Sequence, residues 1–230
     1  MQRYLRLILT IMAAIPAGAS AQTPPPPFEG PVYVATYVEV VPTAMEQGAA
    51  LLKQYRDASR KDAGNQRMEL VQELGRPSRF AILAIWQDQK AFDAHGKSAS
   101  TGEFRDKLKA IQAAPYDDRV HSGLAVAAKD ALRRSAVVVL THVDVPPPFK
   151  DTTIALLQQL AEASRKDTGN QRFEVQQQGN RPNHFTVVES WADRRAYDAH
   201  VMAASTRQFR DKLGPMSGAL YDERLYKPLE

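Results

Sequence analysis

The chain has 230 residues, with 30 basic and 26 acidic side chains and no cysteine. The absence of cysteine excludes disulfides, thiolate metal ligands and a cysteine nucleophile. Basic residues alternate with acidic ones, as in SRKD and FRDK, rather than forming a positive stripe, so nucleic acid is not an expected partner. A chain of this length forms one large domain or two small ones.

The first 21 residues have the pattern of a secretory signal peptide. Two arginines precede an apolar run from residue 7 to residue 17, and the triplet ASA at 19–21 supplies a small-x-small cleavage site. The run is shorter than the roughly 20 residues of a membrane anchor. We therefore expect a bacterial protein exported to the periplasm or secreted, with no membrane attachment after cleavage and a net charge of about +2.

The chain repeats itself at a fixed offset of 105 residues. SRKDAGNQRMEL at 59–70 returns as SRKDTGNQRFEV at 164–175, and 31 of 61 positions from Ser59 to Arg119 are identical in the second copy. An offset of domain length indicates a tandem duplication. The predicted organisation is a signal peptide (1–21), a Pro-rich leader (22–31), repeat one (32–121), a linker (122–134) and repeat two (135–230).

Both copies show the same order of elements. A β-branched alternating run begins each copy and predicts a strand, and a helix follows that ends at Gly64 or Gly169. Two strands joined by a short turn come next, then a helix with Asp88 or Asp193 at its N-cap, a second short helix and a final strand. This order is a ferredoxin-like βαββαβ unit.

The third strand of repeat one, FAILAIW at 80–86, is apolar on both faces, so both faces must be covered. Helices cover one face, and the sheet of the sister repeat is the natural cover for the other. The predicted fold class is therefore α+β, with two ferredoxin-like repeats packed sheet to sheet as an intramolecular dimeric α/β barrel. Strand alternation places Tyr37 and its equivalent His142 between the sheets. Further self-association is left open.

The second copy combines a Gly-x-x-x-x-Glu run at 169–174, Arg-Pro-Asn-His-Phe at 181–185, Glu-Ser-Trp at 189–191 and a later His200. In this combination it resembles the antibiotic biosynthesis monooxygenase domain, a family of dimeric α/β barrels. Repeat one departs from the pattern, with Ala84 where repeat two has Glu189. The resemblance implies a small cavity between sheet and helices. It also implies oxygenation of quinols or anthrone-like polyphenols without metal or flavin, although other members degrade haem and many have no demonstrated activity.

The predicted catalytic residues are in repeat two. Trp191 is expected to be an aromatic wall facing an open cavity, Glu189 a proton acceptor or anchor, and His200 with His142 a polar gate. A buried carboxylate needs a partner or a cavity, and Arg172 on the neighbouring strand is the candidate partner of Glu189. The predicted substrate pocket comprises Tyr37, Trp86, His95, His142, Arg172 and Phe185.

Each assignment has a structural alternative. The two tryptophans can be core residues, and His95 and His200 can simply bind a backbone carbonyl near a helix end. No metal or cofactor is expected, because the five histidines show no i, i+4 pair; haem ligation by a histidine is a minor alternative. The predicted function is cofactor-independent oxidation of a quinol or polyphenolic aromatic with dioxygen. The alternative is a non-catalytic exported module that binds a hydrophobic aromatic ligand, which Ala84 mildly favours.

Overall fold

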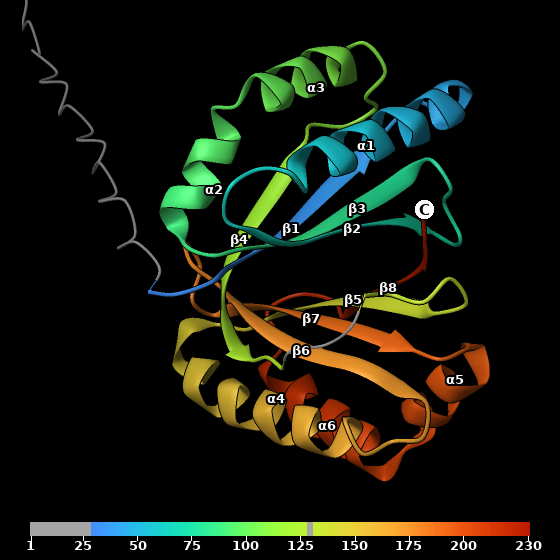
Figure 1. The fold of residues 1–230 in the computed structure, drawn as a ribbon. Helices are drawn as coiled ribbons and strands as arrows, with labels where there is room; N and C mark the ends of the chain where they lie inside the picture. The colour runs from blue at the N-terminus through green and yellow to red at the C-terminus, as the bar shows by residue number, and fades with distance from the viewer. Residues whose placement is uncertain (1–28, 128–130) are drawn as a thin grey trace, which may run out of the picture.

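The computed structural model describes residues 29–127 and 131–230; the predicted signal peptide lies outside them, as does most of the Pro-rich leader. Repeat one and repeat two each contain four strands and three α-helices (Figure 1). Repeat one consists of β1 (Val32–Glu39), α1 (Met45–Ser59), β2 (Asn65–Glu73), β3 (Arg79–Trp86), α2 (Gln89–Gly96), α3 (Ala99–Lys109) and β4 (Asp117–Ala125).

Repeat two consists of β5 (Val137–Asp144), α4 (Lys150–Ser164), β6 (Asn170–Gln178), β7 (His184–Trp191), α5 (Arg194–Met202), α6 (Ala204–Leu213) and β8 (Asp222–Pro228). Short 3-10 turns occur at Pro42–Ala44, Pro147–Phe149 and Gly214–Met216. The order of elements confirms the predicted βαββαβ unit in both copies. In the described part of the chain, no helix is long and apolar enough to cross a membrane.

The eight strands form one closed barrel in the order β1-β3-β2-β8-β5-β7-β6-β4, which confirms the predicted intramolecular dimeric barrel. The last strand of each repeat closes it, because each pairs with its own repeat and with the sister repeat. Strand β4 continues to Ala125, past the predicted end of repeat one at residue 121, because its second half pairs with β6. The helices lie on the two outer faces of the barrel (Figure 1).

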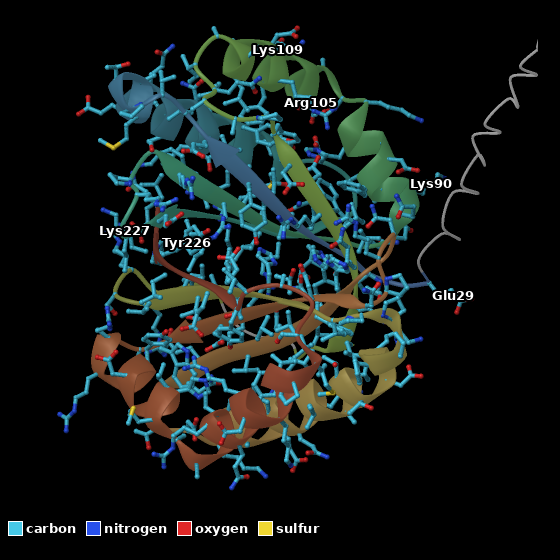
Figure 2. The ribbon with its side chains drawn as sticks, turned by 180° about the vertical axis from the view of Figure 1, so that it is seen from behind. Glu29, Lys90, Arg105, Lys109, Tyr226 and Lys227 are labelled. Atoms are coloured by element: carbon cyan, nitrogen blue, oxygen red, sulfur yellow. The ribbon has the colours of Figure 1, made fainter. Side chains whose placement is uncertain are left out.

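The strands bury both faces, as the apolar third strand predicts. Phe80, Ile82 and Trp86 pack under the helices of repeat one. Ala81 and Leu83, on the opposite face of β3, pack with residues of repeat two inside the barrel. Seen from behind, Tyr226 lies between the two halves (Figure 2). Each repeat therefore supplies one outer core and half of a shared inner core.

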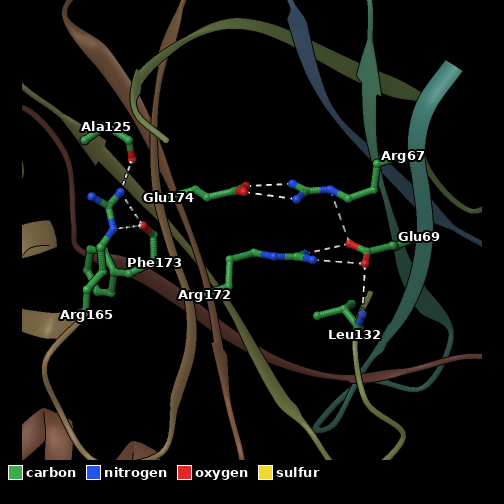
Figure 3. Close-up of polar contacts among 8 residues, drawn as sticks. All are labelled: Arg67, Glu69, Ala125, Leu132, Arg165, Arg172, Phe173 and Glu174. Carbon is green, nitrogen blue, oxygen red and sulfur yellow. Dashed lines mark hydrogen bonds and ion pairs between the residues drawn. The ribbon is translucent and has the colours of Figure 1, made fainter. Parts of the chain in front are cut away.

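Two reciprocal ion pairs cross the barrel interior (Figure 3). Arg67 of β2 donates two hydrogen bonds to Glu174 of β6, at 3.0 and 2.7 Å, and Arg172 of β6 donates two to Glu69 of β2, at 2.6 and 3.1 Å. The two pairs are equivalent under the 105-residue offset, so each repeat gives its arginine to the other's glutamate. The same contact made twice is what a two-fold axis requires of an isologous interface.

Candidate active site

The three predicted catalytic residues lie together on the outer face of β7. Glu189 and Trp191 share this face because they are two residues apart on a strand. The Trp191 Nε1–H donates to Glu189 Oε2 at 2.9 Å. Helix α5, capped by the Asp193 side chain, brings the His200 ring onto the indole with 4.4 Å between ring centroids. The His200 Nε2 atom lies 3.7 Å from Glu189 Oε2.

His200 is held from its other side by Asp167, whose Oδ2 lies 2.9 Å from His200 Nδ1. Asp167 belongs to the tight turn after α4, where Gly169 has a φ of +83°. A Cβ on Gly169 would lie 2.5 Å from the Ala196 Cβ, so only glycine lets this turn approach α5 so closely. A carboxylate only accepts hydrogen bonds, so Nδ1 carries the proton and Nε2 presents a lone pair toward Glu189. Burial lowers the pKa of His200 against the opposing effect of Asp167, which favours the neutral ring.

Burial raises the pKa of Glu189 to about 8. The hydrogen bond from Trp191 opposes this rise, and the nearby negative charge of Glu223 adds to it. The Glu189 carboxyl is therefore mostly protonated at neutral pH, which is the condition of a carboxyl group that can donate or accept a proton near physiological pH.

A polar rim connects the Glu189 cluster to solvent. Glu223 of β8 accepts hydrogen bonds from the Tyr197 hydroxyl and, at 2.9 Å, from Arg210. The Arg210 guanidinium lies over the ring of Tyr221, 5.1 Å from its centroid. Exposure rises outward, from 5% of the Glu189 side chain to 17% of Glu223 and 34% of Arg210. Charged groups thus lead from the buried carboxyl to the surface.

Repeat one keeps this frame but changes two of its positions. His95 stacks on Trp86 with 4.3 Å between centroids, and its Nδ1 lies 2.7 Å from Asp62 Oδ2. The Glu189 position is occupied by Ala84, and the His95 Nε2 atom instead lies 2.8 Å from the hydroxyl of Tyr55 on α1. The residue equivalent to Tyr55 in repeat two is Leu160. The two repeats thus present different groups to their equivalent histidines, His95 and His200.

A family model described as antibiotic biosynthesis monooxygenase matches residues 31–107 and 136–212, one match in each repeat and more than half of the chain together. The chain belongs to the antibiotic biosynthesis monooxygenase family. Most of each repeat lies inside its match, including the Trp–His–Asp frame described above. Of the rim residues, Glu223 and Tyr221 lie beyond the second match. This family member therefore carries two copies of its domain in one chain.

The chain is similar to one named protein in sequence and to two solved structures in fold. The Bacillus subtilis (strain 168) protein named "Putative monooxygenase YcnE" is 27% identical over 86 residues, covering 37% of this chain and 90% of that protein. The structure of a "Putative monooxygenase" from Fusobacterium nucleatum aligns with a TM-score of 0.78 at 15% identity, over 88% of this chain and 94% of that one. An "anthrone oxidase-like protein" aligns with a TM-score of 0.68 at 11% identity, over 88% and 92%. The two structural matches show a shared fold.

The nine residues predicted from the sequence of this monooxygenase-family chain fall in three separate places. Phe185 lies in the outer core of repeat two with the Glu189 cluster. Trp86 and His95 form the corresponding cluster in repeat one. The remaining three lie inside the barrel, on the opposite face of the sheets from Glu189: Tyr37, His142 and Arg172.

The predicted pairing of Arg172 with Glu189 is wrong. A bulge between Asn170 and Arg172 sets Arg172 opposite Ser190, which points to the other face of β7 from Glu189. Arg172 is therefore directed into the barrel, where its guanidinium binds Glu69 of the sister repeat. The partner of Glu189 is instead the indole N–H of Trp191, two residues along the same face of β7.

The predicted gate of His200 and His142 is also wrong, because the two rings lie on opposite faces of the sheet. His142 is opposite Thr186 in the β5–β7 ladder, and its Nδ1 lies 3.2 Å from the Thr186 hydroxyl. The edge of its ring meets Tyr37 with 5.3 Å between centroids. Burial lowers the pKa of His142 to about 3, so this histidine is neutral inside the barrel.

The expectation that Trp191 faces an open cavity is wrong as well. The residue is 0% exposed, so no void large enough for water adjoins it. The stacked imidazole of His200 and the carboxyl of Glu189 occupy the positions where a cavity was expected. Across residues 29–127 and 131–230, no three potential metal ligands among His, Asp and Glu lie close enough together to hold an ion.

Sequence reasoning missed Asp62, Asp167, Tyr55 and the rim residues. The available signal was the duplication itself, because SRKD, FRDK and the YDDR/YDER pair recur at the 105-residue offset. These segments contain Asp62 and Asp167, Arg210, and Glu223 with Tyr221. Alternating charge in such segments is usually a solvated surface, so the pattern by itself does not predict site residues.

We expect Glu189→Gln to flatten the dependence of stability on pH. The folded protein keeps the Glu189 proton up to about pH 8, whereas the unfolded chain releases it near the ordinary value of 4.5. Wild-type stability is therefore full below that lower value and falls by about 1.4 kcal/mol per pH unit between the two. Glutamine has no proton to release. Urea denaturation of both proteins across this range measures the difference, and parallel curves would mean that Glu189 is ionised in the folded protein.

Proposed function

We propose that this chain is a cofactor-independent monooxygenase that oxidises a quinol or polyphenolic aromatic with dioxygen, and that repeat two is its active half. The observation that carries the proposal is the pairing, in one buried cluster, of a neutral His200 with a Glu189 carboxyl whose pKa is raised to about 8. Membership of the monooxygenase family and similarity to an anthrone oxidase-like fold support it. The signal-peptide pattern supports action outside the cytoplasm.

The first step is removal of a proton from the substrate hydroxyl. The lone pair on His200 Nε2 accepts this proton, and Asp167 at Nδ1 stabilises the resulting imidazolium. The phenolate is electron-rich enough to give an electron to dioxygen directly. Because the site is dry, charge developing on the phenolate is stabilised by fixed groups of the protein rather than by water.

The overall reaction balances without another reductant. A quinol converted to a hydroxyquinone supplies four electrons; one oxygen atom of dioxygen enters the ring and the other leaves as water. Loss of that second oxygen from a ring-bound peroxide requires a proton, which the neutral carboxyl of Glu189 can donate. Glu189 thus acts as an acid in the second half of the reaction, after His200 has acted as a base.

Oxygen consumption tests the proposal. Chelator-treated, flavin-free protein mixed with a reduced naphthoquinone should consume oxygen, and Glu189→Gln should lower the rate by about 100-fold, the low end for loss of a general acid. Glu162→Gln is the matched control, since Glu162 is an exposed glutamate of α4 and its loss should leave the rate unchanged.

Wild-type turnover in Glu189→Gln would remove this residue from the mechanism. Binding of reduced naphthoquinones without any oxygen consumption would instead indicate the alternative function, a module that binds aromatic ligands.

A further inference from the structure

Repeat one contains a phenol bound to its own histidine. The ring of Tyr55 stacks on Phe104, with 3.9 Å between centroids and 7° between planes. Its hydroxyl lies 2.8 Å from His95 Nε2 and 3.5 Å from the Thr101 hydroxyl. Because Asp62 holds the proton of His95 on Nδ1, the Tyr55 hydroxyl is the donor to Nε2. This is the contact that a phenolic substrate would make with a catalytic histidine.

Repeat two has the same frame without the phenol. Phe209, His200 and Thr206 occupy the positions of Phe104, His95 and Thr101, but Leu160 replaces Tyr55. Leucine provides neither the ring that would stack on Phe209 nor the hydroxyl that would reach His200 Nε2.

A pocket of about 210 Å³ is present at this place between α4 and α6, with Leu160 and Phe209 among its lining residues. A cavity of about 150 Å³ is large enough for a benzene ring. Leu160 lines this pocket, and its counterpart Tyr55 contacts His95 directly, so by the repeat equivalence the Leu160 position adjoins both the pocket and His200. A ring that pushes the leucine side chain aside therefore reaches the histidine.

The pocket also has a charge preference that the equivalent surface of repeat one lacks. Lys212 is exposed at the pocket, and no carboxylate in the described part of the chain pairs with it. Its counterpart Lys107 lies 3.8 Å from Glu103. Repeat two has Gln208 in place of Glu103, so the ammonium group is available to an anionic ligand.

We propose that Tyr55 is a built-in phenol that closes repeat one, and that a phenol bearing a carboxylate takes the same position in repeat two by displacing the smaller Leu160 side chain. The ligand ring stacks on Phe209, its hydroxyl donates to His200 Nε2, and its carboxylate faces Lys212. The inference that this ligand is a substrate rests on the proposed function. Binding of the ligand can be measured without turnover.

Calorimetric titration with 4-hydroxybenzoate under nitrogen tests the inference, using two reciprocal variants. Wild type should bind one molecule per chain. Leu160→Tyr should weaken binding at least tenfold, because the new phenol occupies the position, and Tyr55→Leu should add a second, weaker site, because Lys107 is paired with Glu103. Repeat one shows that the fold accommodates tyrosine at this position, and thermal melting of Leu160→Tyr checks this directly.

Lys212→Glu provides a test that does not disturb the interior. It should weaken 4-hydroxybenzoate binding at least fivefold and leave binding of unsubstituted phenol unchanged. Equal binding by wild type and a folded Leu160→Tyr, or unchanged binding in Lys212→Glu, would overturn the inference. Binding as expected but no oxygen consumption with any quinol would overturn the proposed function alone.

Discussion

Arg172→Met is expected to destabilise the whole chain by about 3–5 kcal/mol, the usual cost of removing one partner of a buried ion pair. Arg172 is 1% exposed and Glu69 is 5% exposed, so the substitution leaves a carboxylate inside the barrel without its bidentate partner. Arg67, 3.6 Å from the same carboxylate, offsets only part of the loss. Chemical denaturation followed by circular dichroism measures the change.

The double variant Arg172→Met with Glu69→Leu is the control, because it removes the stranded charge together with its partner. It should recover most of the lost stability. Both variants should still unfold in one transition, since the two repeats share the inner core. A loss below about 1 kcal/mol in Arg172→Met would show that water reaches the Glu69 carboxylate, as for an exposed ion pair.

Trp191→Ala is expected to lower the free energy of unfolding by about 3–5 kcal/mol, the usual cost of truncating a core tryptophan. The reason is that the indole is fully buried, stacked on His200 and bonded to Glu189. An indole that bordered an open cavity, as the sequence predicts, would already lack neighbours on one side of the ring and would cost less to truncate. Denaturation at constant pH measures the effect.

Trp86→Ala in repeat one is the matched control. Trp86 is 1% exposed and stacks on His95 in the same way, but it faces Ala84 rather than a glutamate. Trp191→Ala should therefore cost more than Trp86→Ala by about 1–3 kcal/mol, the cost of leaving a buried polar group unsatisfied. A loss below about 1 kcal/mol for Trp191→Ala would mean that the indole borders open space after all.

The two repeats have diverged in a compensated way. Repeat one has Tyr55 with Ala84, and repeat two has Leu160 with Glu189. The Nε2 atom of His95 keeps the Tyr55 hydroxyl at 2.8 Å, and that of His200 keeps the Thr206 hydroxyl at 3.4 Å with Glu189 Oε2 at 3.7 Å. A buried imidazole needs such a neighbour or it loses a hydrogen bond. Duplication makes this divergence possible, because in a symmetric homodimer both halves would change together.

Several features of the fold could be predicted from the sequence because they depend on local pattern. The duplication shows as identical residues at a fixed offset, and FAILAIW requires cover on both faces wherever the strand lies. Strand period alone places Glu189 and Trp191 on one face, and Asp193 marks the start of the helix that carries His200. These local patterns are enough to predict the barrel and the residues at the centre of the candidate site.

The partners of the site residues were decided only by the tertiary structure. Regular pairing of the two neighbouring strands would place Arg172 beside Glu189. A one-residue bulge turns the Arg172 side chain to the other face of the sheet, where the sister repeat supplies Glu69. Asp167 reaches His200 because Gly169 allows the turn to contact α5, and Tyr55 reaches His95 because α1 packs beside α3. These contacts join residues that are 33 to 103 positions apart in the chain. The distances between those residues in space depend on how the elements pack as the barrel closes, which no local period of the sequence specifies.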